Sequence, residues 1–212
     1  MSGTLDLSVM YLMHDALRRE AQHLARATAR ADRDPQTVLG TTAGWQLFKT
    51  ALRVHHTAGN DVLWPGLRRS LAGRPGDLMP LEVLEAEHDA IEQVIDVIDA
   101  ALAGPEAGAD QLGDLTDSLA TGVIGHLRHE EDQTVPLILT VTTGGQWERF
   151  KQIHARWIGS DIARVLPWLL DGASDQAVAA VLAAFSEPVR HAYLHRWRPA
   201  YTALDRWSTT TA

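Results

Sequence analysis

The chain of 212 residues contains no cysteine. Disulfides, thiolate metal sites and cysteine nucleophiles are therefore excluded. The sequence also lacks an apolar run long enough to span a bilayer, and its start has no basic region followed by an apolar one. We therefore expect a cytoplasmic protein with no signal peptide and no membrane partner. Glycine (16 residues) and proline (9 residues) are not in excess, which argues against disorder.

Basic residues are fewer than acidic residues. The chain has 19 basic and 27 acidic residues, for a net charge of −8. This balance argues against a nucleic-acid partner or an anionic membrane surface. Neither a glycine-rich phosphate loop nor a Ser-His-Asp arrangement stands out. What the chain does have is ten histidines and seven tryptophans, and the places of these residues are informative.

Apolar residues recur at helical spacing in four long stretches joined by short loops, at about 7–31, 36–65, 80–103 and 110–139. This pattern predicts an all-α fold, an antiparallel up-down four-helix bundle over residues 1–142. Shorter helical patterns follow, and they predict a C-terminal helical extension over residues 143–212, packed on the bundle. Five tryptophans of this extension are interpreted as packing groups, with a Trp-rich dimer surface as the alternative: Trp147, Trp157, Trp168, Trp197 and Trp207. The protein is expected to be a monomer or a homodimer.

Each predicted bundle helix carries one histidine on its apolar face: His14, His55, His88 and His126. With a rise of about 1.5 Å per residue, these four residues fall within about one helical turn of a common depth. Glu130 lies one turn after His126 and shares its face. A buried carboxylate is costly unless it is paired or bound to a metal. The four histidines and the glutamate therefore predict a metal site inside the bundle, with ligands that suit iron, manganese or zinc.

The second helix contains two adjacent histidines. The apolar register of Trp45 and Leu52 continues to His55, whereas the polar register of Arg53 continues to His56. This spacing predicts that His55 points into the bundle and that His56 points outward. A His55→Ala change should then abolish metal binding, and a His56→Ala change should not.

Several stretches are similar to one known family: His14, then His55-His56 with Asp61-Val-Leu-Trp-Pro65, then Glu87-His88, then His126 with Glu130-Glu131 and Pro136. Over roughly residues 8–140 the chain resembles the hemerythrin-like, or HHE cation-binding, domain family. The segments 166–170 and 197–199 resemble C-terminal extensions of actinobacterial members. The resemblance implies an antiparallel four-helix bundle with a non-heme di-iron centre that handles dioxygen, peroxide or nitric oxide. It places His14, His55, His88, His126 and Glu130 at ligand positions.

The sequence departs from the family pattern in the second helix. The family usually has a glutamate four residues after the histidine, and this chain has Gly59. Glu85 and Glu131 are possible additional metal ligands. A Gly59→Glu change is expected to raise iron occupancy toward two ions.

We therefore expect a non-heme iron protein with one or two iron ions that binds, senses or detoxifies dioxygen, peroxide or nitric oxide at an atypical site. Whether it is an enzyme stays open. The alternative is a metal-poor bundle that acts as a small-ligand-binding or protein-interaction module, with a gap at Gly59.

Overall fold

The computed structural model describes residues 5–29, 43–104, 109–204 and 206. Within these residues there is no strand, and the predicted all-α fold is confirmed. The bundle is built from α1 (Ser8–Thr28), α3 (Ala43–Ala58), α4 (Trp64–Ser70), α5 (Pro75–Ala103), α6 (Ala109–His129) and α7 (Val135–Val141). The predicted start of the second helix and the end of the first lie partly outside the described residues.

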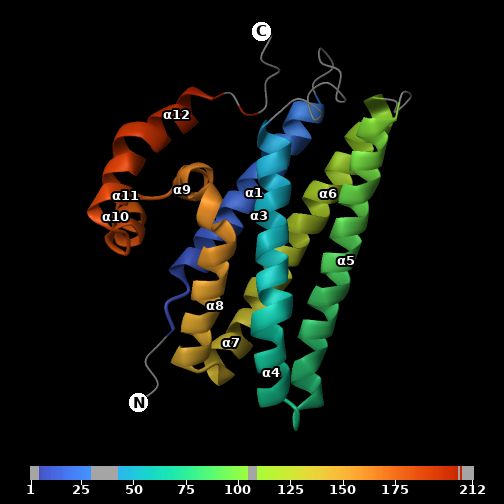
Figure 1. The fold of residues 1–212 in the computed structure, drawn as a ribbon. Coiled ribbons are helices and arrows are strands. Elements are labelled where there is room, and N and C mark those ends of the chain that lie inside the picture. Colours follow the sequence, from blue (N-terminus) through green and yellow to red (C-terminus); the bar gives the residue numbers. More distant parts are fainter. Residues whose placement is uncertain (1–4, 30–42, 105–108, 205, 207–212) are drawn as a thin grey trace.

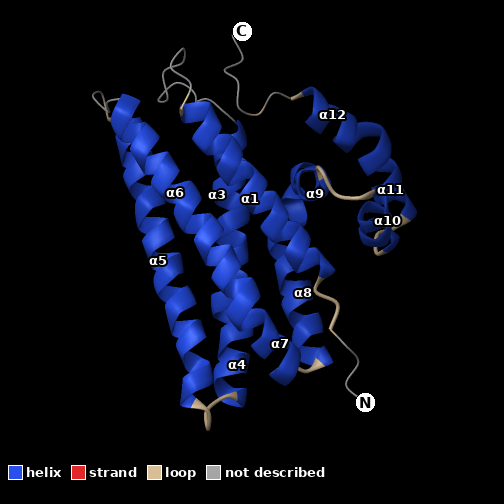
Figure 2. Ribbon diagram, turned by 180° about the vertical axis from the view of Figure 1, so that it is seen from behind, coloured by secondary structure: helices blue, strands red, loops and turns tan. Residues whose placement is uncertain are grey.

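The long helices run antiparallel, as predicted (Figure 1). α1 ascends, α3 with α4 descends, α5 ascends, and α6 with α7 descends. Seen from behind, α5 and α6 form one side of the bundle, and the C-terminal helices lie on the opposite side (Figure 2). Short connections such as the turn between α4 and α5 favour this antiparallel order, because neighbouring helices must reverse direction.

Two bundle helices contain a π-helical turn. The segment η1 (Gly59–Leu63) joins α3 to α4, and η2 (Glu130–Thr134) joins α6 to α7. In each case the next helix has proline at its second position, Pro65 or Pro136. Proline lacks an N–H group, and its ring crowds the carbonyl four residues earlier, so the preceding turn widens. The second helical stretch, predicted to reach about residue 65, therefore widens before Pro65 and continues to Ser70.

The face of α3 that carries polar residues packs against α5. Lys49 donates to both carboxylate oxygens of Asp99, at 2.7 and 2.6 Å, and Trp45 Nε1 donates to the same carboxylate at 2.9 Å. One turn further on, Arg53 pairs with Glu92. Lys49 is buried, so its charge requires this partner. The polar register of α3 therefore faces a neighbouring helix as well as solvent.

The chain after residue 143 folds into α8 (Gly144–Ile158), the short η3 (Gly159–Asp161), α9 (Ile162–Leu170), α10 (Asp175–Ala183), α11 (Glu187–Ala192), η4 (Tyr193–Trp197) and α12 (Arg198–Ala203). Ser174 caps α10 by accepting from Ala177 N, as its position in the sequence suggests. Arg19 of α1 donates to the carbonyls of Trp168 and Asp171 at the end of α9. Trp168 itself is buried in the apolar cluster of the bundle.

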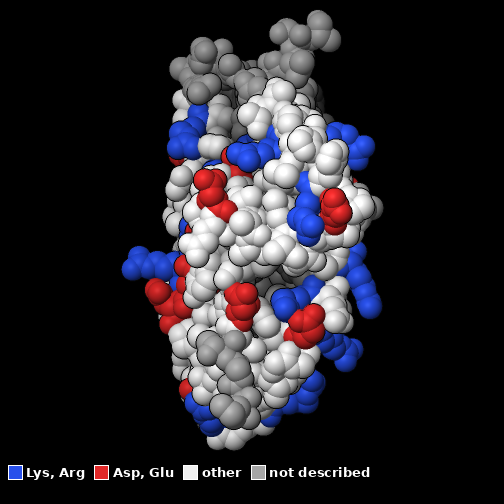
Figure 3. Space-filling view, turned by 90° about the vertical axis from the view of Figure 1, so that its left-hand side faces the viewer, with Lys and Arg blue, Asp and Glu red and all other residues white. Residues whose placement is uncertain are grey.

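The surface shows charges of both signs without a single-sign field on the face formed by the C-terminal helices (Figure 3). In the part of the chain that the structure describes, none of the helices is both long and apolar enough to cross a bilayer. Trp207 of the predicted tryptophan set lies outside the described residues, while Trp147 and Trp168 are buried packing groups.

Trp168 tests how strongly α9 is held against the bundle. Trp168→Ala should lower the free energy of unfolding by about 3–5 kcal/mol, because it leaves a large cavity in a buried cluster. Leu139→Ala, at a position that is 47% exposed, is the control and should change stability by less than about 0.5 kcal/mol. Urea denaturation followed by circular dichroism measures both values. Equal effects would contradict the packing of α9 described above.

Candidate metal centre

A layer of polar side chains divides the core of the bundle. Above it lies one apolar cluster, which includes Leu17, Leu52 and Ile91, and below it lies a second, which includes Leu63 and Leu84. The layer itself consists of six buried titratable residues: His14, His55, His56, His88, His126 and Glu130, each no more than 6% exposed. All four bundle helices contribute to it. The predicted common depth of the four seam histidines thus matches their positions in the structure.

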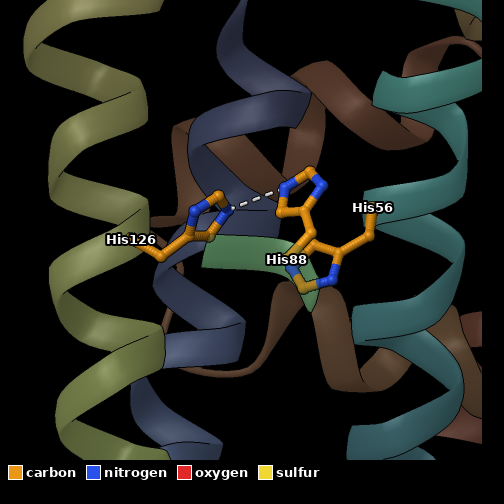
Figure 4. A group of neighbouring side chains, drawn as sticks. All are labelled: His56, His88 and His126. Atoms are coloured by element: carbon orange, nitrogen blue, oxygen red, sulfur yellow. Dashed lines mark hydrogen bonds between the residues drawn. The ribbon is translucent and has the colours of Figure 1, made fainter. Parts of the chain in front are cut away.

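These six residues form two groups of three. His14, His55 and Glu130 make the first group, and His56, His88 and His126 make the second (Figure 4). Within each group, one ligating atom from every residue lies within 4.8 Å of the others. Sites of this size, with three inward nitrogen or oxygen donors, are suited to a metal ion.

Glu130 connects the two groups. Its Oε2 atom lies 3.1 Å from His55 Nε2 and 3.3 Å from His14 Nε2. The same oxygen is 4.0 Å from His126 Nε2, which belongs to the second group. Glu130 is the first residue of the π-helical turn η2, one turn after His126. One carboxylate is therefore positioned between both groups of imidazoles.

The prediction that His56 points outward is wrong. His56 is 4% exposed, and its ring stacks on that of His88 with centroids 3.9 Å apart. The error lies in the interpretation of the polar register of α3, which was taken as a solvated face. Because Lys49 and Arg53 pair with acidic residues of α5, this register turns toward α5 and carries His56 with it. The complementary charges of the two helices were the signal that could have revealed this.

The Nδ1 atoms of three histidines are held by outer groups. His14 Nδ1 lies 2.8 Å from Glu131 Oε1, His88 Nδ1 lies 3.0 Å from Asn60 Oδ1, and His126 Nδ1 lies 3.0 Å from Glu87 Oε2. Since an acceptor oxygen requires a donor, each Nδ1 carries a proton in these bonds. In a neutral ring, this leaves Nε2 free to offer its lone pair to the interior. Metal-binding histidines are commonly oriented in this way.

In the described part of the chain, the inward nitrogens of the second group have no hydrogen-bond donor from outside the group. His88 Nε2 and His126 Nε2 face each other at 3.2 Å (Figure 4). With both Nδ1 atoms protonated, two lone pairs meet, an arrangement that a cation would stabilise. Both ring nitrogens of His56 are buried without a hydrogen-bond partner among the described residues. Buried polar atoms without partners are costly, and a metal bound by the second group would satisfy one nitrogen of His56. The donor set therefore fits a metal.

The protonation states of His56, His88 and Glu130 agree with a metal site. Burial lowers the pKa of His88 to about 3 and holds the pKa of His56 well below its ordinary value, so both rings are neutral near pH 7. Burial also opposes charge on His14, but the adjacent Glu130 and Glu131 outweigh it and raise the pKa of His14 to about 9. Burial works against the Glu130 carboxylate as well, yet His55 and His14 keep its pKa well below the usual range. Without a metal, the layer therefore holds neutral rings at His56 and His88, a protonated His14 and an ionised Glu130. A metal that binds at His14 would displace the proton of its inward nitrogen.

The two further carboxylates considered as ligands lie elsewhere. Glu85 is 39% exposed and pairs with Arg68 at 2.5 Å, so its position does not support a role as an additional metal ligand. Glu131 bonds the outer nitrogen of His14 and also accepts from Arg18 at 2.6 Å. Burial opposes ionisation of Glu131, but these two hydrogen bonds lower its pKa to about 2. Glu131 thus orients His14 from outside the layer.

Gly59 does not leave a gap. A Cβ atom at this position would lie 3.2 Å from Cε2 and Cζ2 of Trp64, so the indole fills the space beside the glycine. Trp64 is 1% exposed and belongs to the lower apolar cluster. A glutamate at position 59 therefore requires the indole to move, a requirement that the expectation for Gly59→Glu did not include.

Comparison with protein families gives one match. The model of the hemerythrin HHE cation binding domain matches residues 5–138, which contain all six residues of the layer. No curated protein and no solved structure shows a significant match to the chain.

His56 provides a direct test of the second group. His56→Leu should reduce the metal content of the purified protein to about half or less, because one of three donors is lost. The exposed His195 is the control, and His195→Leu should leave metal content unchanged. Metal content is measured by inductively coupled plasma mass spectrometry. Full metal content in the His56 variant would show that this ring is a packing group.

Glu131 tests the orientation of His14. Glu131→Gln should weaken metal binding by about 10–100-fold, since the charged acceptor that fixes the His14 ring is lost. Asp132→Asn makes the same chemical change one residue later, at an exposed side chain, and should have no effect. Competition with a chelator of known affinity measures both. Equal affinities in the two variants would contradict the role assigned to Glu131.

Proposed function

The chain belongs to the hemerythrin HHE cation-binding domain family, and from this premise we propose that it is a non-heme iron protein with two metal positions that interacts with dioxygen, peroxide or nitric oxide. One position is assigned to His14, His55 and Glu130, and the other to His56, His88 and His126. The role is binding, sensing or detoxification of such a small molecule.

One observation carries the proposal: two groups of three buried donors meet at a single carboxylate, Glu130. Five buried imidazoles and one buried carboxylate in one layer are costly without a cation, because both nitrogens of His56 and Nε2 of His14 lack hydrogen-bond partners among the described residues. In a family that binds cations, this arrangement is best explained by two ions that share Glu130.

The donor set favours iron over softer metals. It consists of imidazole nitrogens and a carboxylate oxygen, with no thiolate in the chain. Three protein donors at each position leave room for a small molecule to complete the shell. Iron held there would supply redox chemistry toward dioxygen, peroxide or nitric oxide. The protein's own part is to orient the imidazoles through Glu131, Asn60 and Glu87, and to keep bulk water away with the apolar clusters above and below.

The alternative, a metal-poor bundle that admits a small apolar ligand at Gly59, loses its motivation in the structure. Trp64 occupies the space beside Gly59. A metal-free role would also leave the nitrogens of His56 buried without partners in the described part of the chain. The observations therefore favour a loaded site.

Metal content tests the proposal. Protein produced in iron-supplemented medium should contain close to two iron ions per chain and show charge-transfer absorption after oxidation, because both groups of donors are complete. Removal of the metal by a chelator should lower the melting temperature by several degrees, since a bound ion stabilises the folded state. Iron and other first-row metals far below one per chain, together with a melting temperature insensitive to chelation, would overturn the proposal.

The two halves of the bundle place a small and a large side chain in opposite order around the π-helical turn, and this gives a second test. Glu130 begins η2 and Val135 begins α7, and at the equivalent places Gly59 begins η1 and Trp64 begins α4. Gly59→Glu alone should destabilise the protein by about 1–3 kcal/mol, because the side chain overlaps the indole. The double change Gly59→Glu with Trp64→Val should recover part of that loss when iron is bound, and it should shift the absorption spectrum. Thermal melts with and without iron measure this coupling. Equal destabilisation of the single and double variants would contradict it.

A further inference from the structure

The indole N–H of Trp64 is a buried donor without a partner. The side chain is 1% exposed, and Nε1 has no hydrogen-bond acceptor among the residues that the structure describes. The residues of its apolar cluster, such as Leu63, Leu67 and Leu84, offer no side-chain acceptor. An unpaired buried N–H is costly, so its retention calls for an explanation.

The position of this N–H is defined by Gly59. The backbone N–H of Trp64 bonds the carbonyl of Gly59 across the π-helical turn, which brings the indole over the glycine. A Cβ atom at position 59 would lie 3.4 Å from Trp64 Nε1. Gly59 follows His55 by four residues, as Glu130 follows His126 in the other half of the bundle. The N–H therefore lies beside the place where a carboxylate side chain at position 59 would begin.

The charges of the layer favour an anion at this place. The two groups include one carboxylate, Glu130, and two more, Glu131 and Glu87, bind their outer nitrogens. Three carboxylates would thus face the four positive charges of two divalent ions. Excess positive charge in an apolar interior is strongly unfavourable, and a bound anion reduces it. A hydrogen-bond donor beside the site stabilises an anion more than a neutral molecule, because bonds to charged acceptors are about twice as strong.

We propose that Trp64 Nε1 donates a hydrogen bond to a small monoanion that completes the metal shell on the side of Gly59, where the second-helix carboxylate is missing. This inference rests on the proposed function, since it requires a loaded centre. Trp64 is a positioning and selectivity residue in this role. Its N–H group raises the affinity of the centre for small monoanions relative to neutral diatomic molecules such as nitric oxide.

Azide, a small monoanion, is the probe, and Trp64→Phe removes the N–H while keeping an aromatic ring. Titration of the iron-loaded full chain with azide, followed by absorbance, should show about 10-fold weaker binding in this variant. The affinity for nitric oxide should change by less than about 2-fold, because a neutral ligand gains little from the N–H. The control is Trp168→Phe, which also removes a buried indole N–H without a described partner, but from α9. It should leave azide affinity unchanged.

Gly59→Ala is a second variant in which the indole is retained. The added methyl group would lie 3.2 Å from the ring carbons and should displace the N–H, so azide affinity should again fall while iron content stays near the parental value. This variant decides the matter if Trp64→Phe fails to fold. Iron content is measured first in every protein. A parent without metal overturns both the proposed function and this inference. A loaded parent whose azide affinity is insensitive to both changes, or equal losses for azide and nitric oxide, overturns this inference alone.

Discussion

The interior of this bundle must accommodate six buried titratable side chains between two apolar clusters. Transfer of such groups from water is costly unless each finds a partner. The structure meets this constraint in two ways. Outer acceptors bind three of the Nδ1 atoms, and the inner nitrogens converge so that a cation can bind them. The position of the layer along every helix follows from this requirement, since a displaced residue would lie in an apolar cluster with no partner.

The two halves of the bundle solve the same backbone problem with different side chains. Each descending helix widens into a π-helical turn before a proline, at Pro65 and at Pro136. In one half, the turn begins with Glu130 and is followed by the small Val135. In the other half, it begins with Gly59 and is followed by Trp64. The summed side-chain volume of Gly59 and Trp64 is therefore close to that of Glu130 and Val135. The first pair brings an indole N–H group where the second brings a negative charge.

Much of the fold was predictable, because long helices of 3.6-residue periodicity joined by short loops permit few arrangements. The common depth of His14, His55, His88 and His126 followed from the rise per residue alone. His56 was not predictable from hydropathy, since its register carries Lys49 and Arg53 and resembles a solvated face. The contact between Trp64 and Gly59 depends on a π-helical turn, which brings residues five apart together. The 3.6-residue periodicity of a regular helix does not predict this contact. Sequence periodicity thus located the layer but missed the features that depend on helix pairing and on irregular backbone.

The outer partners of the layer also connect it to the surface. His14 reaches Arg18, 23% exposed, through Glu131, and His126 reaches the exposed His129 through Glu87, whose other oxygen lies 2.5 Å from His129 Nδ1. Each carboxylate thus has one oxygen on an inward imidazole and one on a group near solvent. Positive charge in the layer would therefore be balanced by the carboxylates of Glu131 and Glu87. These carboxylates contact groups near solvent, and partial hydration lowers the free-energy cost of keeping them ionised. His56, by contrast, has no such connection in the described part of the chain, because its two nitrogens lack protein partners. Within the second group, His56 is therefore the residue whose burial a bound ion would offset most directly.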